Sequence, residues 1–217
     1  MRLITAEELK TSPTGYREIA QALNRGGLVC FPAESTYRLA CDLMSDEAVT
    51  RLLQSKRRSE HHPALVFVTD VSMLRRVVAD VPPWARRLAE VFWPGLLTLV
   101  LDIHPDLPPK VARTLARATG KVGVRVPASP IAYRVVREFG GPLLVSSANL
   151  ERRSGASSAA QVKKNFHQRV AVFVDAGDLP SILPSTLVEA DGEGYKVTRE
   201  GAIPESRVAA ALGQVVP

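Results

Sequence analysis

The residues best suited to chemistry in this sequence are cations and small polar groups that lie beside short apolar runs. Lys56 and Arg58 stand two residues apart, and a point-charge lysine beside a forked arginine can hold two phosphate oxygens at once. Cations at the end of a helix also complement its dipole, so a purely structural role for this pair remains open. Arg125 interrupts the apolar run 122–126, and a buried cation needs a carboxylate or an anionic ligand as its partner.

Other polar groups also follow apolar runs. Residues 146–149, Ser-Ser-Ala-Asn, follow the run 143–145, and their backbone N–H groups could surround a phosphate or cap a helix. Residues 32–37 form a polar loop with Glu34, Ser35 and Thr36, and a last cluster joins residues 184–186 to 199–203. Open α/β sheets bind ligands beyond their strand ends. We therefore predict one basic cleft that binds an anionic ligand.

Familiar catalytic and phosphate-binding motifs are missing from the sequence. It contains no GxxxxGK[ST], GxGxxG, HExxH, GxSxG or CxxC motif. Cys30 and Cys41, the two cysteines, lie among apolar residues and are expected to be reduced, buried thiols. The sequence therefore does not support a zinc enzyme or a common hydrolase, and we predict neither a metal site of the protein itself nor a tightly bound cofactor.

Composition and charge limit the classes of partner. The 28 basic and 22 acidic residues give a net charge of +6, which suits a nucleotide or a nucleic acid equally well. Basic doublets such as Arg75-Arg76 and Lys163-Lys164 are scattered along the chain and fit solvated helix faces. No apolar run is long enough to span a bilayer and no signal peptide is evident. We expect a cytoplasmic protein without a membrane partner.

The pattern of apolar residues predicts the elements that position these groups. Helices are expected at 16–24, 46–58, 82–92, 131–139, 159–168 and 206–212, and strands at 28–31, 64–68, 96–101, 122–126, 143–145, 170–174, 186–189 and 195–198. Interleaved helices and strands without a change in composition predict one α/β domain over residues 1–217, with a twisted mixed sheet flanked by helices and a concave basic cleft.

The order and spacing of the clusters resemble the YrdC-like family, the threonylcarbamoyl-adenylate synthases, in their short single-domain form. The resemblance runs from about Ala20 to Ile203. Its motifs are Gly27–Pro32 with Tyr37, Lys56-x-Arg58, Phe92-Trp93-Pro94-Gly95, Leu97-Thr98-Leu99, Gly123-Val124-Arg125-Val126-Pro127, Ser147-Ala148-Asn149, Ser185-Thr186 and Arg199-x-Gly201-Ala202-Ile203.

The resemblance implies an enzyme that makes threonylcarbamoyl-AMP from ATP, L-threonine and bicarbonate, with Mg²⁺ accompanying ATP. Lys56 and Arg58 would be the catalytic residues. The implied ATP-binding residues are Lys56, Arg58, His62, Lys121, Ser147, Asn149 and Arg199. The implied threonine-binding residues are Ser35, Phe67, Arg125, Val145 and Ser185, with Arg125 pairing the threonine carboxylate. A separate threonylcarbamoyl transferase, and tRNA or double-stranded RNA, are the implied macromolecular partners.

Three departures from the family pattern bear on the second substrate. Ala33 replaces the usual threonine after the proline, Arg38 replaces a glycine, and Glu151-Arg152 replaces a Ser-Gly pair. Arg38 is expected to narrow the pocket or to pair with Glu34. Two alternatives therefore remain open, a carbamoyl-adenylate-forming enzyme with another substrate, and a non-catalytic RNA-binding or ribosome-binding protein that uses the same basic cleft.

Overall fold

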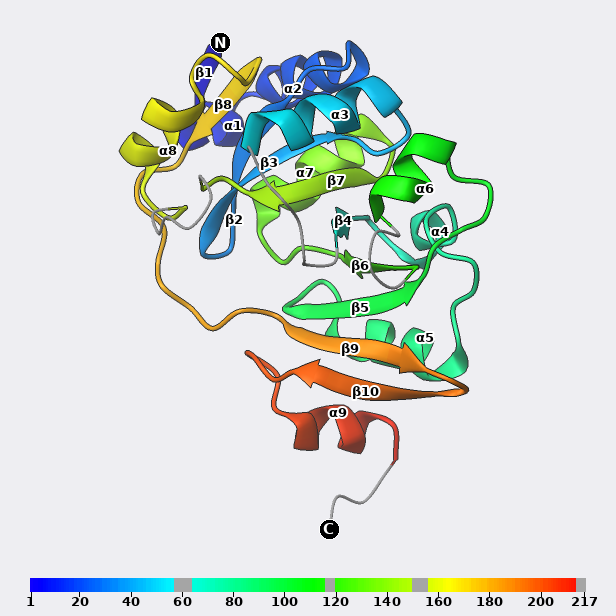
Figure 1. The fold of residues 1–217 in the computed structure, drawn as a ribbon. Helices are drawn as coiled ribbons and strands as arrows, with labels where there is room; N and C mark the ends of the chain where they lie inside the picture. The colour runs from blue at the N-terminus through cyan, green and yellow to red at the C-terminus, as the bar shows by residue number, and fades with distance from the viewer. Residues whose placement is uncertain (57–63, 116–119, 150–155, 214–217) are drawn as a thin grey trace.

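One mixed β-sheet forms the centre of the molecule (Figure 1). The structure, a computed structural model, describes residues 1–56, 64–115, 120–149 and 156–213. Within these residues the sheet has ten strands in the order β1-β8-β2-β3-β7-β4-β6-β5-β9-β10. The strands are β1 (Arg2–Thr5), β2 (Val29–Ala33), β3 (Thr36–Asp42), β4 (Leu65–Phe67), β5 (Leu97–Asp102), β6 (Lys121–Arg125), β7 (Leu143–Ser147), β8 (Val172–Asp175), β9 (Thr186–Asp191) and β10 (Gly194–Arg199).

The strand pairing confirms the predicted mixed sheet. Parallel pairs join β1 to β8, β8 to β2, β4 to β6 and β5 to β9. Antiparallel pairs join β2 to β3, β3 to β7, β7 to β4, β6 to β5 and β9 to β10. Neighbours in the sheet are often distant in sequence, so the sheet brings polar residues from separate motifs together.

Helices cover the sheet, most of them at the positions that apolar periodicity indicates. Among the described residues they are α1 (Ala6–Thr11), α2 (Thr14–Asn24), α3 (Asp46–Lys56), α4 (Val71–Leu74), α5 (Pro83–Phe92), α6 (Pro109–Leu115), α7 (Pro130–Phe139), α8 (Ala159–Phe166) and α9 (Glu205–Ala211). The start and end of α7 follow local rules. The Ser129 side chain caps its first turn, and Gly140, with φ of 77°, ends it in the left-handed conformation.

Two apolar clusters hold these layers together. One joins α3, α5, α8 and α9 to the sheet through residues such as Val49, Leu88 and Phe166. The other joins α1, α2 and α7 to the sheet through Leu9, Ile19 and similar side chains. Because both clusters contain residues from β2, β3, β4 and β7, these strands are buried by packing on two sides.

The structure differs from the prediction most clearly around Pro32. The sequence suggested that the strand ends there and opens into a loop, but β2 and β3 form an antiparallel hairpin in which Pro32 lies opposite Tyr37. Strand β8 pairs only with Val29 and Cys30, so Pro32 lies where β2 has no strand on its other side. A proline is tolerated there because its missing N–H is not required.

Elements β1, β3, α1, α4 and α6 were not predicted.

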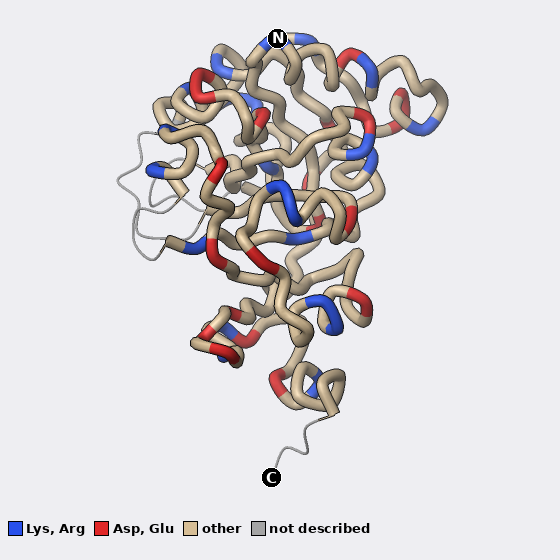
Figure 2. Tube along the Cα trace, turned by 90° about the vertical axis from the view of Figure 1, so that its right-hand side faces the viewer, with Lys and Arg blue, Asp and Glu red and all other residues tan. Residues whose placement is uncertain are grey.

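Surface charge is distributed rather than concentrated. Figure 2 shows basic and acidic segments interspersed over the described part of the chain. Two basic residues from the doublets have acidic neighbours, since Arg87 lies 3.8 Å from Glu90 and Lys163 lies 3.6 Å from Asp175. No helix in the described residues is both long and apolar enough to cross a membrane.

Candidate functional site

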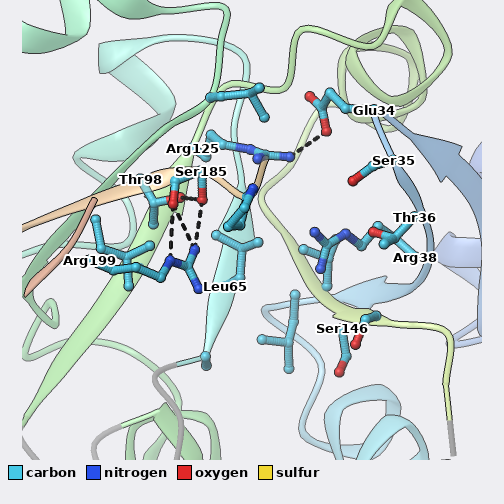
Figure 3. A pocket seen from close by; sticks show the side chains of 18 of the residues that line it. Glu34, Ser35, Thr36, Arg38, Leu65, Thr98, Arg125, Ser146, Ser185 and Arg199 are labelled. Carbon is cyan, nitrogen blue, oxygen red and sulfur yellow. Dashed lines mark hydrogen bonds and ion pairs between the residues drawn. The ribbon is translucent and has the colours of Figure 1, made fainter. Parts of the chain in front are cut away.

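A single large cavity brings together most of the polar clusters that lie in the described residues. It has a volume of about 490 Å³, which is within the range of ligand pockets. Its wall comes from the β2–β3 turn, α3, α6, residues 182–185 and strands β3, β4, β5, β6, β7, β9 and β10. Figure 3 shows side chains from both sides of the cavity pointing toward its centre.

Alternation along the strands explains which side chains reach the cavity. Thr36 and Arg38 on β3 line it, whereas Tyr37 between them is fully buried on the other side. Gly123 and Arg125 on β6 line it two residues apart in the same way. A Cβ atom on Gly123 would lie 3.1 Å from the Thr98 side chain, so glycine keeps this part of the wall open.

Glu34 and Arg125 form a buried ion pair at one end of the cavity. The Arg125 Nη2 atom donates to Glu34 Oε2 at 2.6 Å, and the side chains are only 2% and 9% exposed. Glu34 Oε1 also accepts from the backbone N–H of Ala128 at 2.9 Å, just before α7. The carboxylate predicted for Arg125 is therefore present, and it comes from the β2–β3 turn.

The surroundings of Arg125 favour a fixed guanidinium. Its Cζ atom lies 5.0 Å from the centre of the Phe67 ring, a cation–π contact. Its Nε atom is buried, with no hydrogen-bond partner in the described residues. Burial lowers the pKa of Arg125, Glu34 opposes this effect, and the positive charge of Arg199 adds to it.

Arg199 and Ser185 lie together at the opposite wall, as Figure 3 shows. Arg199 Nε and Nη2 donate to the Ser185 carbonyl oxygen at 3.1 and 2.8 Å, and Nη2 also reaches Ser185 Oγ at 3.2 Å. Ser185 Oγ lies 2.9 Å from Thr98 Oγ1. All these partners are neutral, so the Arg199 charge is available to an anion in the cavity.

Buried Thr186 holds this wall in place. Its Oγ1 donates to the Ile203 carbonyl oxygen at 2.6 Å and accepts from the N–H groups of Gly201 and Ile203, each at 3.0 Å. Because a Cβ atom on Gly201 would lie 2.2 Å from the Pro184 carbonyl oxygen, this position requires glycine. The Ser-Thr and Arg-x-Gly-Ala-Ile motifs thus form one unit.

Arg38 is the wall residue that the family pattern does not include. It lies on β3 opposite Ser147 of β7, and its guanidinium points into the cavity (Figure 3). Burial lowers the pKa of Arg38 to about 10, the charges of Arg125 and Arg199 contribute to the decrease, and Glu34 opposes it. Arg38 was expected to narrow the pocket or to pair with Glu34; it lines the cavity, and Glu34 pairs with Arg125 instead.

The remaining predicted residues fall into three groups. Ser35, Val145 and Ser147 line the cavity. Asn149 accepts a hydrogen bond from Ser147 Oγ through Oδ1 at 2.7 Å, which joins it to that wall indirectly. Phe67 is fully buried and reaches the site through its contact with Arg125.

One described residue among the predictions, Lys121, is not part of the cavity wall, and several others lie outside the described residues. Lys121 does not line it, because its Nζ atom binds Glu189 Oε1 at 3.1 Å and the Ala190 carbonyl oxygen at 2.5 Å. Arg58 and His62 lie outside the described residues, as do Glu151 and Arg152. Lys56 is the last residue of α3. The predicted ATP contacts of Lys56, Arg58 and His62 therefore remain predictions.

Some wall residues had no predicted role. Thr98 was noted only as part of a motif, although a polar residue between two leucines in a buried strand was a usable signal. Ile182 and Leu183 line the cavity and are 42% and 65% exposed. They precede Ser185 on the long connection from β8 to β9, and nothing in their local sequence indicated this position.

The side chains around the cavity suit the binding of anions. The described residues contain no cluster of three or more His, Cys, Asp or Glu side chains that could hold a metal. Cys30 and Cys41 are buried free thiols, and burial raises the pKa of both. Three arginines and several hydroxyl groups around the cavity instead suit charge neutralisation and positioning.

Proteins of similar sequence carry the name threonylcarbamoyl-AMP synthase. The threonylcarbamoyl-AMP synthase of Bacillus subtilis is 30% identical over 210 residues, which are 96% of this chain and 60% of that protein. The synthase of Alkalilimnicola ehrlichii is 36% identical over 168 residues, 77% of this chain and 82% of that protein. This chain thus spans less than two thirds of the B. subtilis relative.

A solved structure shows the same fold. The crystal structure of P. abyssi Sua5 complexed with L-threonine superposes with a TM-score of 0.85 at 26% identity, covering 99% of this chain and 61% of that chain. The Sua5, YciO and YrdC family model, described as "Telomere recombination", matches residues 21–201. The chain belongs to the Sua5/YciO/YrdC family.

Proposed function

We propose that this chain forms threonylcarbamoyl-AMP from ATP, L-threonine and bicarbonate, with release of pyrophosphate. The observation that carries the proposal is the 490 Å³ cavity, where Arg38, Arg125 and Arg199 surround a space with Glu34 as the only acid among its described lining residues. Such a wall suits the simultaneous binding of a nucleotide and a small anion. The names of the two relatives and the threonine complex of P. abyssi Sua5 support the choice of substrates.

The reaction needs positioning more than a dedicated base. The threonine amine attacks the carbon of bicarbonate and water leaves, which gives a carbamate. A carbamate oxygen then attacks the α-phosphorus of ATP, and the bond to the pyrophosphate oxygen breaks. Both steps bring anions together, so cationic side chains that neutralise charge lower the barrier.

The described residues divide between the two substrates. We assign Arg199, Ser147 and Asn149 to ATP, together with Lys56, Arg58 and His62 from the sequence pattern. Lys121, which the sequence pattern also suggests, would have to leave Glu189 and the Ala190 carbonyl oxygen to contact ATP. Mg²⁺ would accompany the triphosphate and offset part of its negative charge.

The threonine side is assigned to Ser35, Val145 and Ser185, with Arg125 and Phe67 as the rigid end of the pocket. Ser185 lies within hydrogen-bond reach of both Arg199 and Thr98, and we assign it to the boundary between the ATP side and the threonine side of the cavity. The product would then be passed to a separate transferase for tRNA modification.

Pyrophosphate release tests this proposal. The purified protein is incubated with ATP, Mg²⁺ and bicarbonate, with L-threonine or each of the other amino acids. Pyrophosphate that depends on both threonine and bicarbonate supports the proposal. Absence of release, or release that depends on a different amino acid, contradicts it.

A further inference from the structure

Arg38 is a cation in the cavity wall that forms no ion pair with an acidic side chain among the described residues. It projects from β3 between two residues that face away, Tyr37 and Leu39, both fully buried. Its Nε atom is buried, with no hydrogen-bond partner in the part of the chain that the structure describes. Arg38 as a whole is partly buried, so an anion beside its guanidinium would offset the cost of withdrawing that charge from water.

Glu34 cannot serve Arg38 as a full partner because its oxygens are already engaged. Oε2 accepts from Arg125 Nη2 at 2.6 Å, and Oε1 accepts from Ala128 N at 2.9 Å and from Ser129 N at 3.4 Å. Glu34 is also the only acid among the described residues that line the cavity. Once Arg125 and Glu34 neutralise each other, Arg38 contributes an uncompensated positive charge.

The same contacts change the interpretation of Arg125. A carboxylate that approached Arg125 would meet Glu34, which is held 2.6 Å from its guanidinium. Two carboxylates bound to one guanidinium repel each other, and a partly buried site screens this repulsion less than water does. The Arg38 guanidinium points into the cavity, as Figure 3 shows, and its Nε atom has no hydrogen-bond partner among the described residues.

We propose that Arg38 binds a planar carboxylate-type anion, either the carboxylate of the amino-acid substrate or bicarbonate, and so takes the role that the family pattern suggests for Arg125. The inference rests on the proposed function, since it concerns the substrates of that site. A single guanidinium matches a planar monoanion in charge and in fork geometry. The more highly charged triphosphate is a poorer match beside Glu34.

The test compares L-threonine with L-threoninol, which lacks the carboxylate. Binding of each to the wild type and to Arg38→Met is measured by calorimetry in bicarbonate-free buffer with a non-hydrolysable ATP analogue. A carboxylate held by Arg38 predicts that Arg38→Met weakens threonine binding roughly 10- to 100-fold and changes threoninol binding less than about twofold. If bicarbonate is the ligand, threonine binding is unchanged and the KM for bicarbonate rises by a similar factor.

Control variants separate this role from a structural one. Arg17→Met removes an exposed arginine outside the cavity and should change the binding of neither threonine nor threoninol. Arg125→Met should affect threonine and threoninol equally. Thermal unfolding of each variant checks that it is folded, and Arg38→Met should be at least as stable as the wild type because it removes a poorly compensated charge.

Specific results would overturn the inference. One is an Arg38→Met variant with unchanged threonine binding and an unchanged bicarbonate KM. Others are loss of ATP-analogue binding alone, and discrimination between threonine and threoninol that disappears in Arg125→Met but persists in Arg38→Met while the bicarbonate KM of Arg38→Met stays unchanged. Failure of the proposed function would look different. The wild type would then release no pyrophosphate, regardless of how threonine and threoninol bind.

Discussion

The buried pair between Glu34 and Arg125 gives a prediction whose size follows from the structure. Glu34→Gln keeps the side-chain shape and an oxygen for the Ala128 N–H group, but it removes the negative charge 2.6 Å from the Arg125 guanidinium. Arg125 is then a buried cation without its acid, since its side chain is only 2% exposed. Breaking a buried pair by removing one partner costs about 3–5 kcal/mol, and the retained hydrogen bond places this variant near 3 kcal/mol.

For a chain of this length, a loss of about 3 kcal/mol lowers the melting temperature by roughly 6–12 °C. Thermal and urea unfolding measure it, in chloride buffer, because phosphate or sulfate could replace the missing carboxylate. The double variant Glu34→Gln/Arg125→Met removes both charges and should recover part of the loss, so the two single effects should not add. A loss below about 1 kcal/mol, or strictly additive losses, would refute the reasoning.

The Lys121–Glu189 pair offers a matched control. Its nitrogen and oxygen lie 3.1 Å apart, but the side chains are 20% and 18% exposed. Solvent screens a pair of this kind, so Glu189→Gln should cost no more than about 1 kcal/mol. A difference between the two glutamates then reports burial rather than charge alone.

Other predictions concern the walls of the cavity. The Tyr37 hydroxyl donates to Gly177 O at 2.7 Å, and burial raises its pKa to about 12. The stabilisation from this hydroxyl is therefore fully present below pH 10, the usual tyrosine pKa, and is lost as the pH rises from 10 to 12. Denaturant titrations should show the wild type about 1–2 kcal/mol more stable than Tyr37→Phe below pH 10, and this difference should shrink between pH 10 and 12. Thr186→Val leaves two backbone N–H groups without their acceptor and should cost about 2–4 kcal/mol, measured by urea unfolding; a cost near zero would mean that water replaces the hydroxyl. Gly201→Ala places a methyl group 2.2 Å from a backbone oxygen and should lower the melting temperature and the ATP affinity together. Arg199→Met should raise the KM for ATP about tenfold with little change in stability, and an unchanged KM would exclude its role in ATP binding.

The sequence predicted the long, periodic elements well. Helices α2, α5 and α7 lie within two residues of their expected bounds because each carries an apolar stripe and clear boundary residues. Strand β3 was missed because it follows a turn-rich segment and has Arg38 among apolar residues, which hides its pattern. Short elements such as β1 carry too few residues to show any period.

The sequence indicated several residues that line the cavity, but it did not indicate which residues they contact. The need of Arg125 for a carboxylate followed from a charge in an apolar strand, but its partner lies 91 residues away in the chain and depends on the strand order. Lys121 looked equivalent to the other basic residues, although it lies beside Glu189 from a strand two positions along the sheet. Contacts of this kind are set by the sheet, and no local pattern reveals them.

The central claim is that the cavity joins a carbamate made from threonine and bicarbonate to the α-phosphate of ATP. Mass spectrometry of the products made with ¹³C-labelled bicarbonate tests it most directly. The account predicts one adenylate that contains threonine and one labelled carbon, formed together with pyrophosphate. An unlabelled adenylate, in which threonine is joined to AMP without the carbamoyl carbon, or the absence of any adenylate, would contradict it.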